Sequence, residues 1–188
     1  TEECYRTVYE AISDLQKIPT SIDVRSYEPV SLPEIDEISD LARELRGKLL
    51  YNHVSTATRA VAQTRFKALK AGQNFHDLKN ELKSTYSDAE RTQNTIYMRL
   101  RYDEPSGTVV NVRKSMWIHP ELDRAISIRE AARLQTFPDS FIFEGTKDSQ
   151  YQQVGNAVPP FLAKAIAMSI ADALKSKDNN NKKRNSLL

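Results

Sequence analysis

The chain has little of several residue types on which common functional sites depend. Cysteine occurs once among the 188 residues, at Cys4, which excludes an internal disulfide and a zinc site built on cysteines. Cys4 lies near the chain start without a Pro-Cys loop, so we interpret it as a bystander rather than a nucleophile. The five glycines are too few for the Gly-rich loops that cradle phosphates. The sequence therefore offers neither thiol chemistry nor a nucleotide-binding loop of its own.

Long apolar stretches are also scarce. We find no uninterrupted run of about 18 apolar residues and no signal peptide, which predicts a protein without a membrane span. We therefore expect an intracellular protein, cytoplasmic and associated with the nucleoid if the cell is bacterial. Apolar residues make up 39% of the chain, enough for a modest core with much polar surface.

The formal net charge is only +2, but the charges are segregated along the chain. Residues 28–40 carry five acids and no base, whereas residues 43–70 carry seven bases and one acid. Residues 175–188 carry five bases and one acid. Such segregation can build a positive face for a phosphate backbone. The alternative is that these charges are solvated helix faces with no partner.

Helical periodicity dominates the first half of the chain. Apolar residues share one face at 5–15, at 35–46 and at 57–69, and each pattern predicts a helix. Residues 19–33 contain three prolines and are predicted to be a loop. The period then changes, and 96–102 and 108–112 are predicted to be short strands joined by a turn.

The last third is helical again. Ser127 and Glu130 form a capping box before a helix that continues to Gln135. Pro160 is predicted to open the last helix, which presents one apolar face and ends near Leu174.

Two blocks in this last third carry specific motifs. The first is Ile118-His119-Pro120, followed by Asp123-Arg124 and by the run from Arg129 to Asp139, REAARLQTFPD. The second is GNAVPP, from Gly155 to Pro160. In the first block His119 precedes a proline and has no carboxylates arranged around it in the sequence, so we do not assign it a catalytic role. In the second block Gly155 permits a tight backbone approach, and the Asn156 amide offers donors and an acceptor.

The order and spacing of these blocks resemble the last two signature motifs of DNA (cytosine-5)-methyltransferases. The resemblance extends at low specificity to 7–15, a segment similar to the one that follows the catalytic core in many of these enzymes. It implies that the first block braces the target-recognition region without a catalytic group. It also implies that the second block lies at the edge of an S-adenosylmethionine pocket, with Gly155, Asn156, Ala157 and Val158 against the cofactor.

The resemblance also implies where DNA is contacted. In the family, Thr followed by Leu, Val or Ile at about the place of Thr108-Val109 belongs to the target-recognition domain and lies near the flipped cytosine. Basic residues around it are expected to meet phosphates, or alternatively are solvated: Arg99, Arg101, Arg113 and Lys114. Base-reading residues are expected between about residues 51 and 111.

The family's chemistry requires groups that this sequence lacks. A cysteine in a Pro-Cys loop attacks C6 of cytosine, and Glu-Asn-Val and Gly-x-Gly segments complete the catalytic and cofactor sites. No such segment occurs in the 188 residues. We therefore assign no catalytic residue and no metal site, and expect the chain alone to be inactive.

The elements and the resemblance together imply an α+β fold. It would comprise a small mixed target-recognition domain of short strands and helices, and a C-terminal helix that packs on a Rossmann-like catalytic domain absent from this sequence. We divide the chain into a linker and helical segment (1–50), the target-recognition domain (51–143), a cofactor-edge loop with the C-terminal helix (144–174), and a disordered basic tail (175–188).

The expected function is recognition of duplex DNA and completion of the cofactor pocket in an enzyme that methylates C5 of cytosine. The catalytic motifs would come from a partner subunit or from the N-terminal half of a longer chain. The alternative is a stand-alone DNA-binding protein without enzymatic activity, which leaves the Gly155–Val158 block unexplained. Neither the recognition sequence nor the choice between restriction–modification and orphan methylation can be read from the residues.

Overall fold

The computed structural model describes residues 5–25 and 28–185, with side chains up to Ser176, so Cys4 lies outside the described residues. The chain divides into two compact units, the first ending at Ala157 and the second beginning at Val158. A single short antiparallel sheet is described, in which β1 (Val30–Ser31) pairs with β2 (Leu49–Leu50). The mixed helix and strand content agrees with the predicted class, although the strands are very short.

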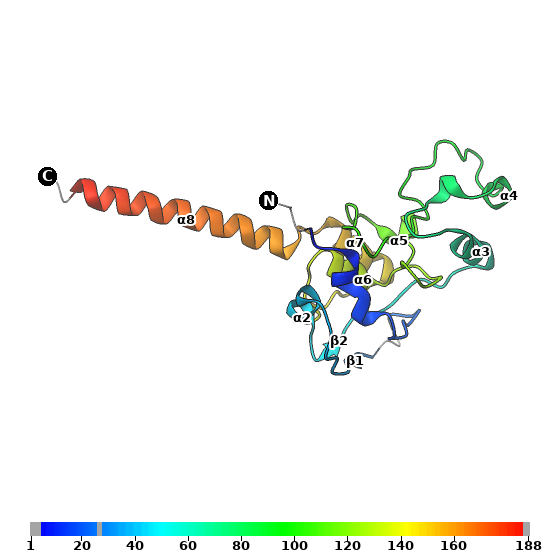
Figure 1. Cartoon of the computed structure of the whole chain (residues 1–188), viewed down its shortest axis with the longest axis horizontal. Helices are drawn as coiled ribbons and strands as arrows, with labels where there is room; N and C mark the ends of the chain where they lie inside the picture. The colour runs from blue at the N-terminus through cyan, green and yellow to red at the C-terminus, as the bar shows by residue number, and fades with distance from the viewer. Residues whose placement is uncertain (1–4, 26–27, 186–188) are drawn as a thin grey trace. The chain divides into compact units, whose positions relative to one another are not determined.

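The first unit is built around α6 (Ile128–Leu134), which begins at the predicted capping box of Ser127 and Glu130. Both α1 (Val8–Ile12) and α7 (Lys147–Asn156) pack against α6 (Figure 1). Ala131 and Ala132 are fully buried, and their small side chains permit this close packing. Segments 1–50 and 51–143, which the sequence distinguished, therefore share one core.

The N-terminal helix starts later than predicted. Thr7 and Glu10 form a capping box for α1, and a 3-10 turn, η1 (Ser13–Leu15), continues it. Val8, Ile12 and Leu15 are buried as predicted, but Tyr5 precedes the cap and is 63% exposed. The next helix, α2 (Asp40–Leu45), is also shorter than predicted because Ser39 caps it. Leu41, Ala42 and Leu45 face the core next to α1.

A second hydrophobic cluster lies around α3 (Ala60–Ala68), the 3-10 turn η2 (Phe75–Asp77) and α4 (Asn80–Lys83). Arg65 of α3 is buried between the rings of Tyr86 and Tyr97, with its guanidinium carbon 5.2 Å from each centroid. The cluster connects α3 with the motif block near Ile118. Its buried members are Ala62, Phe66, Leu69, Phe75, Leu78, Tyr97, Ile118 and Ala125.

The two strands predicted at 96–102 and 108–112 are not formed, and this expectation is corrected. Tyr97 adopts a left-handed φ of 52°, which interrupts the first run, and Arg99 forms only an isolated bridge with Ile118. In the second run Asn111 caps a short helix, α5 (Val112–Ser115). In the second run Val109 is buried from irregular backbone and Val112 from α5, instead of from a sheet.

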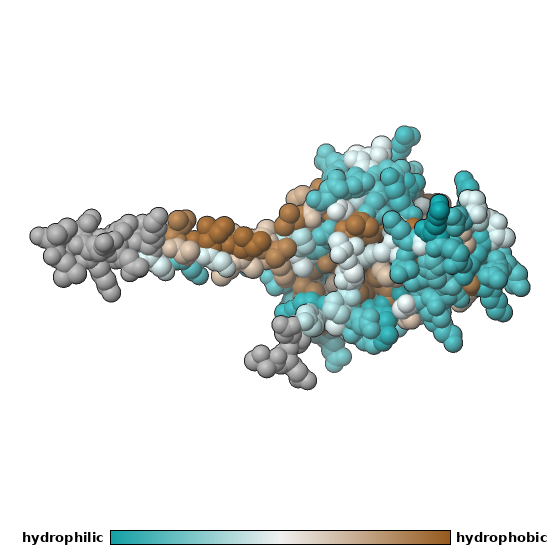
Figure 2. Space-filling view, turned by 90° about the horizontal axis from the view of Figure 1, so that it is seen from above, coloured by the Kyte–Doolittle hydropathy of each residue, from teal (hydrophilic) through white to brown (hydrophobic). Residues whose placement is uncertain are grey.

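The second unit is the helix α8 (Pro160–Asn185). It opens at Pro160 as predicted but continues past Leu174, its predicted end, because no proline or glycine follows within it. The large aliphatic side chains along it are more than half exposed, and Figure 2 shows a brown stretch there. They include Leu162, Ile166, Met168, Ile170 and Leu174.

The same part of the chain is apolar on average, although it contains no uninterrupted run of 18 apolar residues. The stretch Lys147–Ser176 contains an 18-residue window of mean hydropathy 1.4, long and apolar enough to cross a membrane by length and composition alone. Such a window also arises in a helix that packs its apolar face on another protein. Lys164 and Asp172 lie within this part of α8.

Candidate functional site

The predicted DNA-contact segment lies on irregular backbone that leads into α5. Thr108 and Val110 are exposed, whereas Val109 is buried and anchors the segment. The Asn111 side chain accepts a hydrogen bond from the Lys114 backbone amide and so caps α5. Thr108 is therefore held on the surface next to a buried anchor, at the approach to a short basic helix.

The structure brings this segment against the second motif block. A Cβ atom on Gly155 would lie 2.7 Å from the carbonyl carbon of Val110 and 3.0 Å from the amide nitrogen of Asn111. Only glycine fits at such a distance from rigid backbone. The tight approach predicted at Gly155 is thus made to the chain itself. Two blocks that are about 45 residues apart in sequence form one surface.

The four predicted phosphate contacts have different surroundings. Lys114 is exposed at the end of α5. Arg113 is partly exposed and forms an ion pair with Asp148 at the start of α7. Arg101 is exposed but pairs with Asp103 and Glu104, which raises the pKa of the arginine. Of these four cations, Lys114 is therefore the one whose side chain is best placed to reach a phosphate.

Arg99 is corrected as a DNA contact. The residue is 4% exposed, and its guanidinium donates to the carbonyl oxygens of His119 at 2.9 Å and Phe66 at 2.6 Å. It also donates to the Asp123 carboxylate at 2.6 Å. Because these acceptors lie inside the first unit, Arg99 joins α3 to the first motif block and does not reach a phosphate.

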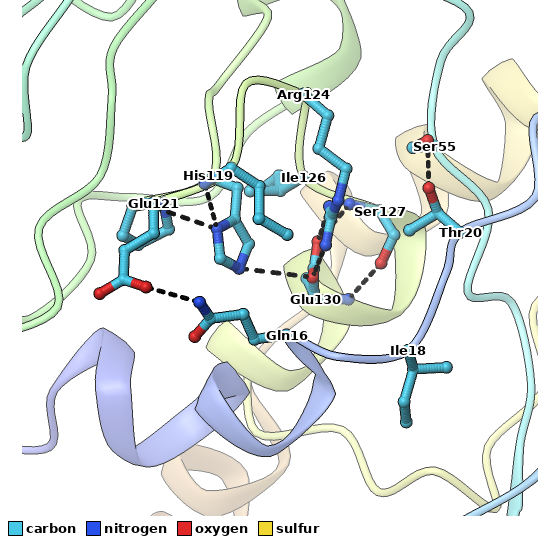
Figure 3. Close-up of polar contacts among 12 residues, drawn as sticks. Gln16, Ile18, Thr20, Ser55, His119, Glu121, Arg124, Ile126, Ser127 and Glu130 are labelled. Atoms are coloured by element: carbon cyan, nitrogen blue, oxygen red, sulfur yellow. Dashed lines mark hydrogen bonds and ion pairs between the residues drawn. The ribbon is translucent and has the colours of Figure 1, made fainter.

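The first motif block contains a buried polar cluster, shown in Figure 3. The Glu130 carboxylate is fully buried and accepts hydrogen bonds from Arg124 at 2.7 and 2.6 Å and from the Ser127 amide at 2.7 Å. Burial raises the pKa of Glu130, but the Arg124 hydrogen bonds outweigh it and hold the pKa well below the usual value. Ser127 also pairs with the buried His53 through its hydroxyl, at 3.0 Å.

His119 is part of the same cluster, and one statement about it is corrected. A carboxylate does lie near it, because its Nε2 is 3.9 Å from the Glu130 Oε1 atom. Its Nδ1 accepts from the amides of Glu121 and Leu122 at 3.2 and 3.1 Å. Burial lowers the pKa of His119 to about 4. This neutral, enclosed imidazole holds the loop before α6 in place and faces no open site.

The two arginines of α6 are buried rather than presented to solvent. Arg133 pairs with Asp139 at 2.6 and 2.9 Å and with Asp14 at 2.6 Å. Arg129 donates to the carbonyl oxygens of Tyr51, Pro138 and Phe141, at 2.8, 2.8 and 2.5 Å. Both guanidinium groups are tolerated inside because carbonyls and carboxylates surround them. The block therefore braces the core of the first unit.

The predicted cofactor residues lie at the end of the first unit and the start of the second. Gly155 and Asn156 complete α7 rather than forming a loop, and Ala157 follows as its C-cap. Asn156 is exposed, and Val158 is 62% exposed. Within the first unit, Asn156 therefore lies at an open edge at the end of α7.

Two residues that the sequence did not single out connect the predicted DNA-contact segment with α7. The side chains of Asn111 and Gln152 form a hydrogen bond of 3.0 Å from α5 to α7. Asn111 lies two residues after the predicted Thr108-Val109 contact, and Gln152 lies three residues before Gly155 of the GNAVPP block. Their proximity in sequence to the motifs was a signal, but no local pattern predicts that the two segments meet.

Several known proteins are similar in sequence to this chain. The chain is 35% identical over 185 residues to the type II methyltransferase M.DdeI of Desulfomicrobium norvegicum, a match to 90% of this chain and 44% of M.DdeI. It is 49% identical over 81 residues to M.AgeI of Thalassovita gelatinovora, covering 42% of this chain and 19% of that protein. The chain thus spans less than half the length of both relatives.

A shorter relative is matched almost completely. The chain is 33% identical over 142 residues to the type II methyltransferase M.AquIB of Picosynechococcus, covering 70% of this chain and 94% of M.AquIB. Among solved structures, a DNA modification methyltransferase encoded within an E. coli prophage superposes with a TM-score of 0.65 at 22% identity. That match covers 93% of this chain and 49% of the other, and shows that the fold is shared.

The profile of the family described as C-5 cytosine-specific DNA methylase matches residues 7–172, most of the chain. Both motif blocks and the segment between them lie inside this range. The chain belongs to the C-5 cytosine-specific DNA methylase family.

Proposed function

We propose that this chain is the DNA-recognition and cofactor-edge portion of a DNA (cytosine-5)-methyltransferase. The family acts on cytosine in DNA and uses S-adenosylmethionine as methyl donor. In the proposal, residues near Thr108 contact duplex DNA beside a cytosine turned out of the helix. A partner subunit or an N-terminal half supplies the attacking cysteine.

The observation that carries the proposal is the contact between Gly155 and Val110. It joins the segment assigned to DNA with the block assigned to the cofactor, with no space for one extra carbon atom between them. A DNA-binding protein without enzymatic activity has no need of the second block. An enzyme that must hold a base and a methyl donor within reaction distance does need both in one place.

The open edge at the end of α7 fits part of a cofactor site. The exposed amide of Asn156 can donate and accept hydrogen bonds. Gly155 is already in contact with Val110, so its role is to bring the edge close to the DNA segment. Bound S-adenosylmethionine would supply the methyl group, and most of its pocket would belong to the catalytic portion.

The size of one relative supports a separate catalytic portion. M.AquIB is matched over 94% of its own length, so a curated methyltransferase polypeptide exists that consists almost entirely of the part found here. The exposed apolar residues of α8 fit the same arrangement, since they would be covered by the catalytic domain. The relatives named type II methyltransferases support a setting in restriction–modification, inside the cell and without a membrane.

Reconstitution tests the proposal. The purified chain and a protein that carries the Pro-Cys loop, obtained by pull-down from the native host, are assayed for transfer of a labelled methyl group to duplex DNA. We expect no transfer by this chain alone and transfer by the mixture. If the chain alone methylates cytosine, the proposed division of labour is wrong. If the mixture stays inactive while the chain binds DNA, the stand-alone DNA-binding alternative is favoured.

The cofactor edge is tested in the reconstituted complex by Asn156→Ala. The substitution removes an exposed amide, and we expect weaker S-adenosylmethionine binding, by about fivefold for one net hydrogen bond. DNA affinity measured without cofactor should remain unchanged. Equal loss of both affinities would indicate a folding defect instead of a cofactor contact.

A further inference from the structure

A continuous chain of side-chain hydrogen bonds runs from the cofactor edge to the DNA-contact segment. The Gln152 amide nitrogen donates to the Asn156 Oδ1 atom at 2.7 Å, and both residues lie on α7. The Gln152 Oε1 atom accepts from the Asn111 amide nitrogen at 3.0 Å. Gln152 is thus the middle member, with one bond to each side.

Asn111 extends the connection to the basic helix α5. Its Oδ1 atom accepts from the Lys114 backbone amide, so the side chain that holds Gln152 also caps α5. The ion pair of Arg113 with Asp148 joins the same two helices a second time. The position of Asn156 is therefore connected, bond by bond, to the helix that carries the proposed phosphate contacts.

The connection combines weak, exposed side-chain hydrogen bonds with a rigid backbone contact. Gln152 and Asn156 are exposed, so water competes for their hydrogen bonds, and each bond adds little in the free protein. In contrast, Gly155 is in direct contact with the backbone of Val110 and Asn111 and cannot move independently of it. A ligand that orders Asn156 and excludes water would strengthen the hydrogen bonds over this rigid contact.

We propose that Gln152 is a positioning residue that couples binding of the methyl donor to binding of DNA. Ordering Asn156 by the cofactor orders Gln152 and Asn111, and so prepares the DNA-contact segment and α5 for the duplex. The converse holds with the same factor, because coupling between two binding equilibria is reciprocal. The inference rests on the proposed function, since it takes both ligands from it.

The test uses the complete enzyme, formed by this chain and its catalytic portion. The dissociation constant of S-adenosylhomocysteine, which cannot react, is measured with and without a short duplex that the wild-type enzyme methylates. The dissociation constant of the duplex is measured with and without S-adenosylhomocysteine. The ratio of paired constants gives the coupling factor, which a merely structural role would not change.

Gln152→Met removes both hydrogen bonds and keeps the length of the side chain and its compatibility with a helix. We expect each ligand alone to bind within about twofold of wild type and the coupling factor to fall about fivefold, the value of one net hydrogen bond. Asn111→Asp keeps the cap on α5 but loses the amide donor, and should lower the coupling factor similarly. The double variant should show no further loss, because both substitutions break one chain.

Gln16→Met is the matched control. Gln16 also accepts one side-chain hydrogen bond, from the Tyr102 hydroxyl at 3.1 Å, and donates one, to Glu121 at 2.5 Å. It should leave the coupling factor at the wild-type value.

The proposal is overturned if Gln152→Met keeps wild-type coupling, or if Gln16→Met lowers it equally. A wild-type enzyme that methylates DNA but binds the two ligands independently also overturns it, while leaving the proposed function intact. An enzyme that methylates no duplex overturns both.

Discussion

Arg124→Met should destabilise the first unit strongly, because it leaves a carboxylate buried without its cation. Glu130 is fully buried and receives three hydrogen bonds, of which Arg124 supplies two and the Ser127 amide the third. Removing one partner of a buried ion pair costs about 3–5 kcal/mol. The remaining Ser127 bond offsets part of this, so we expect a loss of about 3 kcal/mol of unfolding free energy. This is a large share of the roughly 5–15 kcal/mol of a typical domain.

The assay is urea unfolding of wild type, Arg124→Met, Glu130→Gln and the double variant. In the double variant both charges are gone, while the glutamine still accepts from Ser127. We therefore expect it to be more stable than Arg124→Met alone. Arg43→Met is the matched control, since Arg43 pairs with Asp40 on the surface with side chains 59% and 85% exposed. It should cost less than about 0.5 kcal/mol.

Two results would refute this reasoning. One is a double variant whose destabilisation equals the sum of the single variants, which would mean that the two charges do not interact. The other is an Arg124→Met variant as stable as Arg43→Met, which would mean that the Glu130 carboxylate reaches water in the folded protein.

Three further predictions concern pH, packing and charge. Burial lowers the pKa of His119 from 6.5 to about 4, so unfolding takes up a proton between these pH values. The stabilisation present above pH 6.5 is therefore lost as the pH falls toward 4, and at pH 5 the loss is about 2 kcal/mol. Thermal unfolding of His119→Asn should depend less on pH than that of wild type. Gly155→Ala should cost about 1–3 kcal/mol because its Cβ would lie 2.7 Å from Val110, whereas Gly107→Ala, whose nearest neighbour is 3.9 Å away, should be nearly neutral in the same unfolding assay. Lys114→Gln should weaken DNA binding and reduce the slope of log affinity against log salt by about one, and an unchanged slope in a salt titration would exclude it as a phosphate contact.

The sequence predicted those features that depend on neighbours a few residues apart. The capping box of Ser127 and Glu130 begins α6, and Pro160 begins α8, because a cap satisfies amides of the same turn and proline has the backbone angle of a first helical position. The family was also predicted from local motifs, and the match over residues 7–172 confirms it. The assignments of single residues to DNA and cofactor stay predictions, except Arg99.

Features that depend on distant partners were decided only by the tertiary structure. An arginine such as Arg99 or Arg133 looks solvent-exposed in a sequence, and it is buried here because carbonyls and carboxylates from remote segments surround it. The β-branched run at 108–112 predicts a strand, yet among the described residues no neighbouring strand pairs with it, and Asn111 caps a helix instead. Strand pairing and burial of an ion pair both require a second segment, and the local sequence does not specify which segment packs there.

By itself the sequence determined the family, the starts of α6 and α8, and the absence of a catalytic thiol loop from these residues, since each is a property of adjacent residues. The structure alone decided that Gly155 lies on Val110 and that Gln152 bridges Asn111 to Asn156. A glycine without a side chain and two amides of ordinary polarity give no local sign of their partners. Their contacts form only because α7 packs against α5 and so brings residues 110–111 next to residues 152–156.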